Sequence, residues 1–377
     1  MTNSKLARVL RLTLLAASLT LAAVAQPGDK GTLIEFDPPG AATVTSPACG
    51  AYCGTFAYAN NNYGEIVGYY TDTNVVPHGF LRRADGKLVS FDAPGAGLGA
   101  GLDEGTVAIA INDHGEIAGQ YEDSNFVFHG FVRYADDSFA TFEAPSAGSG
   151  PNQGTLAYDI NLEGETAGVY VDTNNVQHGF VRSPSGDITT IDPTGSVGTM
   201  VCEETCLNLE GVIAGYFLDA SNTFHGFVRQ PNGTIEQIDA PGAGSGNYQG
   251  TSIASINLEG SITGAFADSN NVEHGFIRTF DSFTTFEVPG AGTASGQGTY
   301  SFSINLSGAT AGPFIGTNGV LRGFSRSARG AISIFDAPGA GTAAGQGTRP
   351  STNNAEGVVA GWYIDANSVN HGFLWIP

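Results

Sequence analysis

A tripeptide that recurs at nearly constant spacing constrains the fold of this chain more than any other sequence feature. His-Gly-Phe begins at His78, His129, His178, His225, His274 and His371, and Arg322-Gly323-Phe324 fills the one gap in the series. Successive copies start 47 to 51 residues apart. A repeat of about 40–50 residues without helical periodicity is typical of β-propeller blades, which bury their faces against one another.

Each copy divides into four short apolar runs separated by turn residues, which indicates four antiparallel strands joined by hairpins. In the third copy the runs span residues 155–160, 164–170, 178–182 and 188–192. Residues 31–37 resemble a fourth strand without its own blade, and residues 371–375 a third strand with no fourth after it. The sequence therefore predicts an all-β, seven-bladed β-propeller, with four antiparallel strands per blade and the N-terminal strand joining the last blade to close the ring.

The first 25 residues have the three parts of a signal peptide. Basic residues begin the segment, residues 12–22 are apolar, and Ala23-Val24-Ala25 supplies the small residues of a cleavage site. We therefore expect export to the periplasm or the medium, with residues 26–377 forming a single propeller domain.

The charge balance limits the possible partners. The chain has 15 basic and 36 acidic residues, for a net charge of −21. Nucleic acids and anionic membrane surfaces attract basic patches, so neither is expected as a partner. No segment after the signal peptide approaches the 18 or so apolar residues of a membrane span. We expect a monomer with an extracellular glycan or protein ligand, and the charge is also compatible with a cationic polymer or a divalent cation.

Four cysteines form two close pairs, Cys49 with Cys53 and Cys202 with Cys206. In an exported protein an even number of cysteines favours disulfides. Each pair then requires a turn, because four residues of extended chain would separate the Cα atoms by roughly 13 Å. A four-cysteine zinc site is the alternative, but the pairs fall in the first and fourth repeats, which are not adjacent in a ring. Two local disulfides are the preferred interpretation.

Two motifs give the chain a resemblance to a known family. Residues 111–119 have the pattern Ile-Asn-x-x-Gly-Glu-Ile-x-Gly, and residues 371–375 read His-Gly-Phe-Leu-Trp. With these motifs the sequence resembles the extracellular repeat family named for its His-Ala-Phe motif, although Gly replaces the usual Ala and Arg often replaces Trp. The resemblance covers residues 31–377 and implies an exported bacterial β-repeat protein. It implies no particular activity.

Propeller connectivity gathers the acidic residues on one face, because the fourth-to-first and second-to-third connections share that face. The acidic residues that end the fourth strands are Asp37, Asp92, Glu143, Asp192, Asp239, Glu287 and Asp336. The arginines that end the third strands lie toward the opposite face, and they are Arg82, Arg133, Arg182, Arg229, Arg278 and Arg326. We expect the row of fourth-strand acids to form a ligand-binding face.

An aspartate lies six residues before the histidine in every copy that has either residue. These hairpin aspartates are Asp72, Asp123, Asp172, Asp219, Asp268 and Asp365. In the sixth repeat both residues change together, to Gly316 and Arg322, so the two act as one unit. The preferred interpretation is a structural pair in which the carboxylate bonds the imidazole across the hairpin. The alternative is a metal site at each pair, with calcium as the candidate cofactor, but each hairpin offers few of the oxygen ligands that calcium requires.

An asparagine also recurs, three residues before a glycine, at Asn61, Asn112, Asn161, Asn208, Asn257, Asn305 and Asn354. Asparagine commonly bonds its own turn and adopts left-handed backbone conformations. Turn chemistry therefore accounts for this series.

No set of nucleophile, base and orienting residue is visible in the sequence. An enzymatic propeller breaks its symmetry at the active site, and the unrepeated polar residues are few: His114, Glu203, Glu204, Arg322 and Arg349. The sequence therefore favours a non-catalytic exported binding module with no catalytic residues and no required cofactor, whose ligand is a glycan, a cationic polymer or a protein, with or without a bridging cation. A metal-assisted lyase or hydrolase and a structural envelope or matrix protein are the alternatives.

Overall fold

The computed structural model describes residues 31–45, 49–99, 104–201, 205–280 and 282–377. Residues Thr32–Ile376 form one compact unit. The predicted signal peptide lies outside the described residues. None of the helical residues that the model describes belongs to a helix long and apolar enough to cross a membrane.

The unit is all-β, and its first strands pair in consecutive antiparallel groups of four. One group contains β2 (Thr55–Asn60), β3 (Ile66–Thr71), β4 (Pro77–Arg82) and β5 (Leu88–Phe91). The next contains β6 (Gly105–Ile111), β7 (Ile117–Glu122), β8 (Val127–Arg133) and β9 (Phe139–Phe142). A further group contains β10 (Gln153–Ile160), β11 (Thr166–Val171), β12 (Gln177–Arg182) and β13 (Ile188–Ile191).

The same pairing continues through the second half of the chain. The groups here begin with β14 (Gly198–Val201), β15 (Ile213–Leu218), β16 (Phe224–Arg229) and β17 (Ile235–Ile238). They continue with β18 (Gly250–Ile256), β19 (Ile262–Ala267), β20 (Glu273–Thr279) and β21 (Ser282–Phe286). In the sixth repeat the first strand is split into β22 (Gly298–Thr299) and β23 (Ser303–Ile304), followed by β24 (Thr310–Ile315), β25 (Leu321–Arg326) and β26 (Ile332–Phe335).

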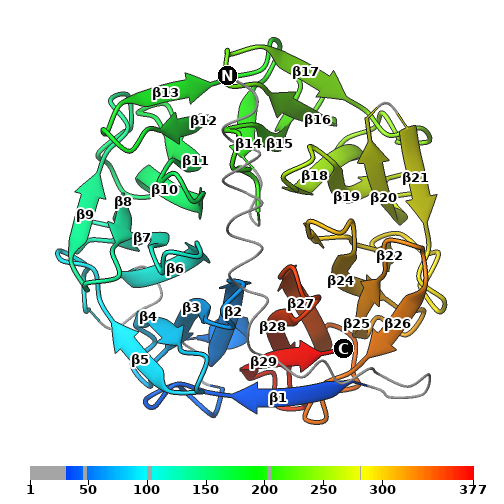
Figure 1. Ribbon diagram of the computed structural model, residues 1–377, viewed down its shortest axis with the longest axis horizontal. Helices are drawn as coiled ribbons and strands as arrows, with labels where there is room; N and C mark the ends of the chain where they lie inside the picture. Colours follow the sequence, from blue (N-terminus) through cyan, green and yellow to red (C-terminus); the bar gives the residue numbers. More distant parts are fainter. Residues whose placement is uncertain (1–30, 46–48, 100–103, 202–204, 281) are drawn as a thin grey trace, which may run out of the picture. The chain divides into compact units, whose positions relative to one another are not determined.

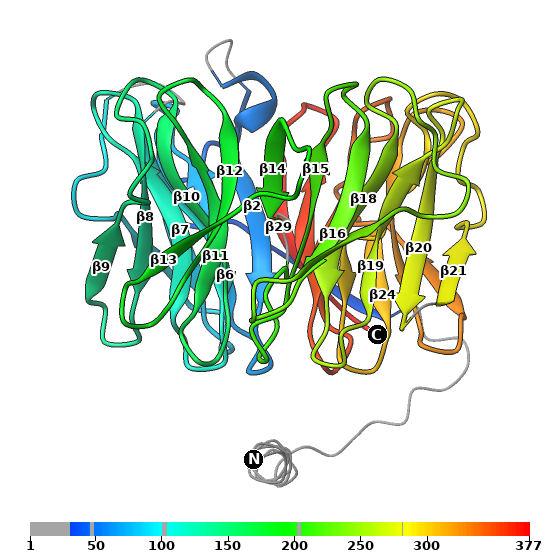
Figure 2. The same ribbon diagram turned by 90° about the horizontal axis from the view of Figure 1, so that it is seen from above.

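The last strands pair with the first strand of the chain. They are β27 (Gly347–Asn353), β28 (Val359–Ile364) and β29 (Asn370–Ile376), and β29 pairs antiparallel with β1 (Thr32–Phe36). Within this unit, Figure 1 shows the groups arranged around a common centre, with the first strand of each group innermost and the fourth outermost. Figure 2 shows the strands running between two opposite faces, where the turns lie.

The phenylalanine of the repeated tripeptide forms the centre of each group. Phe80, Phe131, Phe180, Phe227, Phe276, Phe324 and Phe373 are all fully buried. The preceding glycine is required by packing: a Cβ at Gly79 would lie 2.7 Å from the ring of Phe91, and one at Gly130 would lie 2.7 Å from the ring of Phe142. This close approach explains why Gly precedes the repeated phenylalanine.

The repeated asparagines link successive groups of strands. Each side-chain amide donates to the backbone carbonyl of the asparagine in the next repeat, at 2.9 to 3.3 Å, and Asn354 donates to Asn61. The side-chain oxygen makes the predicted turn bonds: Asn161 Oδ1 accepts from the backbone of Glu163 and Glu165, each at 3.0 Å. Turn chemistry is therefore only half of the role, and we call these bonds between repeats the asparagine series.

One of the two predicted disulfides lies within the described residues. Cys49 and Cys53 are bonded, with their Cα atoms 5.2 Å apart across the short helix η2 (Gly50–Tyr52). The helix supplies the turn that the pair requires. Cys202 lies outside the described residues, so its pairing with Cys206 stays a prediction.

Replacing both Cys49 and Cys53 with serine should lower the free energy of unfolding by about 2 kcal/mol, the chain-entropy value for so short a loop. Urea denaturation under non-reducing conditions measures the change. Reducing agent then provides a control: a further loss in the double-serine variant would report a second bridge between Cys202 and Cys206. An unchanged urea midpoint in the variant would contradict the prediction.

Candidate functional site

Each repeated histidine is held between two carboxylates, and the closer one is in the fourth strand. The Nδ1 distances are 2.8 Å for His78 to Asp92, 2.9 Å for His178 to Asp192, 2.9 Å for His225 to Asp239, 2.5 Å for His274 to Glu287 and 2.7 Å for His371 to Asp37, and His129 bonds Glu143 in the same way. The predicted partner, the hairpin aspartate, lies 3.5 to 3.9 Å from Nε2. The predicted bond across the hairpin is therefore a looser ion-pair contact, and the hydrogen bond is to the fourth-strand acid.

The hairpin aspartates close their own turns. Asp172 Oδ1 accepts hydrogen bonds from the backbone N–H groups of Asn174 and Val176, each at 2.8 Å, and the other five hairpin aspartates bond in the same pattern. The bond from Val176 is the main cause that lowers the pKa of Asp172 below its usual value. These contacts support the structural interpretation of the aspartate–histidine pair.

The sixth repeat shows why aspartate and histidine disappear together. Arg322 replaces the histidine and bonds Asp336 through Nε and a terminal nitrogen, the latter at 2.6 Å. A guanidinium reaches the same fourth-strand acid without the help of a hairpin carboxylate. A hairpin carboxylate is therefore not needed in this repeat, and glycine takes its place at residue 316.

The fourth-strand acids also connect neighbouring groups. Thr55 donates to Asp37 at 2.6 Å, and Thr299 donates to Glu287 at 2.9 Å. Each acid of the predicted ligand-binding row thus bonds the histidine or arginine of its own group of strands. Asp37 and Glu287 also accept a hydrogen bond from a threonine of the next group. The use of this row as a binding face stays a prediction. The contacts described here hold strands and groups of strands together.

The arginines that end the third strands pack against aromatic rings. Arg133 lies over Phe91 at 4.7 Å, and Arg182 lies over Phe142 at 4.7 Å. In each case the ring comes from the fourth strand of the preceding repeat. Through these cation–π contacts, Arg133 and Arg182 link neighbouring groups of strands.

Across the described ranges, no cluster of three or more His, Cys, Asp or Glu side chains has the arrangement of a metal site. The hairpin and fourth-strand carboxylates bond backbone amides and imidazoles instead. A calcium site at the hairpins therefore gains no support from the geometry.

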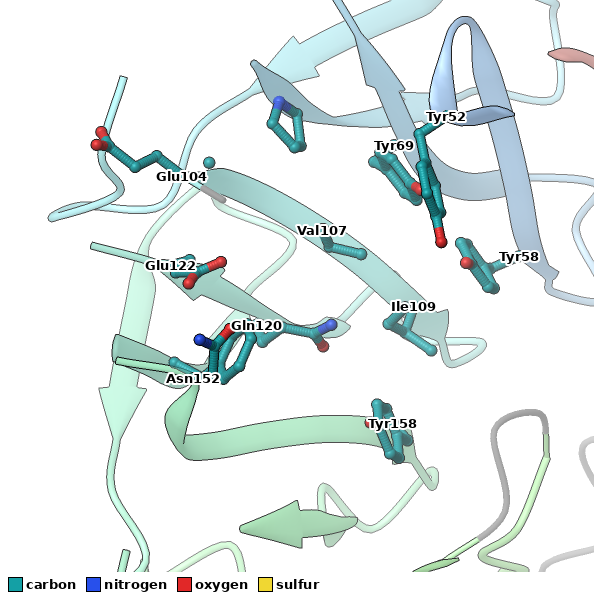
Figure 3. A pocket seen from close by; sticks show the side chains of 13 residues that line it. Tyr52, Tyr58, Tyr69, Glu104, Val107, Ile109, Gln120, Glu122, Asn152 and Tyr158 are labelled. Atoms are coloured by element: carbon teal, nitrogen blue, oxygen red, sulfur yellow. The ribbon is translucent and has the colours of Figure 1, made fainter. Parts of the chain in front are cut away.

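A pocket of about 480 Å³ lies where the inner strands of the first three repeats meet. It is lined by Tyr52, Tyr58, Tyr69, Pro77, Glu104, Gly105, Val107, Ile109, Gln120, Glu122, Phe128, Asn152 and Tyr158. We call it the tyrosine pocket. Figure 3 shows Tyr52, Tyr58 and Tyr69 on one side, the polar side chains of Glu122, Gln120 and Asn152 on the other, and Val107 and Ile109 between them.

Ring contacts hold the tyrosine wall, which consists of Tyr52, Tyr58 and Tyr69. Phe56 stacks on Tyr69 with ring centroids 4.6 Å apart, and Tyr58 stacks on Tyr69 at 6.0 Å. Burial raises the pKa of the Tyr69 phenol well above its usual value, and the neighbouring Tyr58 and Tyr52 add to the shift. The Tyr69 phenol is therefore a neutral hydrogen-bonding group at physiological pH.

The opposite wall is polar. The side-chain oxygen of Gln120 is buried and accepts no hydrogen bond from the described residues. Glu104 accepts a hydrogen bond from the backbone of Gly99 at 2.7 Å, which fixes its carboxylate at the pocket rim. An unpartnered buried acceptor of this kind favours a ligand that donates hydrogen bonds.

The pocket is built from positions at which the repeats differ. The residues three places before the repeated asparagines are Tyr58, Ile109, Tyr158, Thr205, Ala254, Phe302 and Ser351. The residues that follow the glycine of the second strands are Tyr69, Gln120, Val169, Tyr216, Ala265, Pro313 and Trp362. Sequence reasoning weighed the residues that recur and missed these. The signal was available, since large aromatic side chains gather at both positions in the first repeat.

A buried carboxyl group joins the third and fourth repeats. Asp159 accepts hydrogen bonds from the backbone N–H groups of Ile160 and Leu207, each at 2.8 Å. Burial raises the pKa of Asp159 to about 6, against the opposing effect of these bonds. No other repeat has an acid at this position.

Asp159 should make stability depend on pH. Its folded pKa of about 6 exceeds the unfolded value of about 3.9, so the folded state binds more protons between the two. Its contribution is therefore fully present below pH 4 and is lost as the pH rises through 6, by up to about 3 kcal/mol. The difference in unfolding free energy between wild type and Asp159→Asn should shrink or reverse over this range in urea titrations. A difference that does not change between pH 4 and 7 would contradict the assignment.

Comparison with known proteins places the chain by fold alone. No protein-family model and no curated protein matches the sequence, so the family resemblance stays a prediction. A streptogramin B lyase structure matches with a TM-score of 0.51 and 15% identity, over 91% of this chain and 97% of that one. A puromycin hydrolase matches with a TM-score of 0.51 and 11% identity, over 89% of this chain and 56% of that one. A lectin from Burkholderia pseudomallei is also similar, with a TM-score of 0.48 and 11% identity over 85% and 98%. The first two likenesses agree with the strand arrangement described above, which is an all-β, propeller-like fold.

Proposed function

We propose that the chain forms a closed seven-bladed β-propeller, in which the groups of four strands are the blades and β1 completes the last one. Two independent contacts between the ends of the repeat array support closure. β1 pairs with β29 over five residues, from Thr32 opposite Ile376 to Phe36 opposite Gly372. On the inner side, the asparagine series returns from Asn354 to Asn61 at 3.2 Å.

We infer that the protein is a non-catalytic, exported binding module that captures a carbohydrate in the tyrosine pocket. The observation that carries this inference is the pocket wall itself: aromatic faces opposite amide and carboxylate groups, at positions where the repeats differ. A sugar ring presents a face of C–H groups and a rim of hydroxyls. The phenol rings suit the face, and the unpartnered Gln120 oxygen suits a hydroxyl donor.

Export supports this choice of ligand. The predicted signal peptide would deliver a monomeric binding protein to the periplasm or the medium, where polysaccharides are abundant. The row of fourth-strand acids stays a second candidate surface for a cationic polymer or a protein.

Replacing Tyr58 with alanine should weaken oligosaccharide binding by at least tenfold, about 1.4 kcal/mol, because the variant loses one aromatic platform. A glycan array that includes α-1,4-galactotriose, cellotriose and their uronate counterparts, followed by calorimetry, measures the effect. Tyr216→Ala is the matched control, since Tyr216 takes the position of Tyr69 in the fourth repeat and lies outside the pocket lining. Wild-type protein that binds no glycan on the array would refute the proposed function.

The two alternatives make different predictions. A metal-assisted lyase or hydrolase should melt at a higher temperature when calcium or magnesium is added, because a cation that binds only the folded state stabilises it. A purely structural protein should bind neither cation nor glycan.

A further inference from the structure

The aromatic cluster behind the tyrosine pocket continues into the last two repeats. The ring of Trp362 lies 5.5 Å from Phe56 and 5.4 Å from Tyr58, centroid to centroid. Arg349 pairs with Trp362 across strands β27 and β28, and its guanidinium carbon lies 4.4 Å above the Trp362 ring. Arg349 is therefore one ring beyond the tyrosine wall.

A second aromatic ring also contacts Arg349. Its guanidinium carbon also lies 5.0 Å from the ring of Phe302, which belongs to the sixth repeat. Stacking between aromatic faces fixes the plane of a guanidinium and leaves the N–H groups along its edge available to bond. The Arg349 side chain is half-buried, so part of it is exposed to solvent.

Arg349 is an unusual cation for this chain. Its position opposite the second strand is occupied in other repeats by uncharged residues, namely Phe56, Val107, Leu156, Met200 and Ser252. Acidic residues outnumber basic ones by 36 to 15, yet no hydrogen bond or ion pair with another described residue occupies its guanidinium. A positioned cation without a carboxylate partner, beside a ligand pocket, is suited to an anion on the ligand.

Its charge also reaches the pocket. Burial dominates the raised pKa of Tyr69, and Arg349 is the one neighbour that acts in the opposite direction, lowering that pKa. Trp362 contacts both Tyr58 and Arg349, so the positive charge lies one aromatic ring away from the tyrosine wall.

We propose that Arg349 forms a carboxylate subsite, and that the ligand of the tyrosine pocket is an acidic oligosaccharide containing a uronic acid residue. The inference rests on the proposed function and specifies its substrate class. A guanidinium fork matches a carboxylate in two parallel hydrogen bonds. A single cation suits one negative charge better than a doubly charged phosphate. At the other end of the pocket, Glu104 and Glu122 repel a carboxylate and accept hydroxyl donors, so the sugar chain has a defined direction.

The test compares trisaccharides that differ only at C6. The probes are α-1,4-trigalacturonate against α-1,4-galactotriose, and β-1,4-triglucuronate against cellotriose, measured by calorimetry at about 150 mM salt. Wild-type protein should bind one acidic probe at least tenfold more tightly than its neutral match. Raising the salt concentration should weaken only the acidic probe, since screening acts on the charged contact.

Substitutions at two arginines locate the subsite. Arg349→Met should abolish the preference for the acidic probe, and Arg349→Lys should keep part of it, because the ammonium retains the charge but not the planar fork. Arg329→Met removes the same charge at an exposed site and should have no effect.

The outcomes separate this inference from the proposed function. Equal wild-type binding of the acidic and neutral probes would overturn the carboxylate subsite and leave the carbohydrate pocket standing. A preference that survives in folded Arg349→Met protein would also overturn it. Binding of neither probe class would overturn both the subsite and the proposed function.

Discussion

A protein that lacks residues 31–37 should lose roughly 5–8 kcal/mol of unfolding free energy, the largest effect expected of any change considered for this chain. The deletion removes the whole of β1 and its five-residue pairing with β29. It also removes Phe36, whose ring meets Phe80 edge-on at 5.9 Å, and Asp37, which bonds His371 at 2.7 Å. Backbone hydrogen bonds, apolar burial and a charged contact are thus lost together.

Urea denaturation measures the loss, and size-exclusion chromatography reports its consequence. With β1 gone, β29 becomes an open edge strand that can pair with another molecule, so the variant should also associate. Adding a synthetic peptide of residues 31–37 should restore both the midpoint and the monomer. Within the intact strand, Phe36→Ala should be far more damaging than Ile34→Ala, because Ile34 is 38% exposed. A deletion variant with an unchanged midpoint would show that the ring does not depend on this strand.

The order of the strands could be predicted because it is encoded locally and then repeated. In the third copy, the predicted runs at 155–160, 164–170, 178–182 and 188–192 correspond to β10 to β13, with bounds that differ by at most two residues. Turn residues and apolar alternation act over a few positions, and repetition averages out local ambiguity. The exception is the split first strand of the sixth repeat. There Pro313 lies opposite Tyr300 and has no N–H to donate, which interrupts the ladder.

The histidine partner was predicted only in part, although the sequence contained it. His178 in β12 faces the chain just beyond Ile191 in β13, because Gly179 pairs with Ile191. The acid that follows, Asp192, is therefore the direct cross-strand neighbour of His178. The same separation of 14 residues recurs in His78 with Asp92, His129 with Glu143 and His225 with Asp239, and it shortens to 13 at His274. The last histidine, His371, bonds Asp37 from the other end of the chain. Strand register was the missing information, and the constant separation would have supplied it.

The candidate site could not be found from the repeated residues, because these serve the folding of each group of four strands. His-Gly-Phe, the hairpin aspartate and the asparagine recur since each solves a folding problem present in every copy. A single ligand site requires the opposite, a set of side chains that occurs once. Tyr58, Gln120 and Arg349 each differ from their counterparts in most other repeats, and only the three-dimensional arrangement shows that such residues meet around one cavity and its extension.

The asparagine series leads to the second large effect. Asn208 is buried, its Nδ2 donates to the Asn257 carbonyl at 3.2 Å, and its Oδ1 accepts from the backbone of Glu210 and Val212. Asn208→Asp keeps both turn bonds, since aspartate accepts as well as asparagine does. It replaces the donor between repeats with a second carboxylate oxygen that faces the Asn257 carbonyl.

Asn208→Asp should therefore cost roughly 3–5 kcal/mol at neutral pH, at least as much as Asn208→Ala, because a buried charge opposes a carbonyl that has lost its donor. This site suits the test because Val212 stands where Asn61, Asn112 and Asn161 have a glutamate four residues on, so no neighbouring acid complicates the result. Lowering the pH toward 4 should recover part of the loss, since a protonated carboxyl can donate to the carbonyl again. If turn chemistry alone placed asparagine here, Asn208→Asp would stay within about 0.5 kcal/mol of wild type in urea denaturation while Asn208→Ala would not. That result would remove the asparagine series as a link between repeats and leave the proposed ring closure to the pairing of β1 with β29.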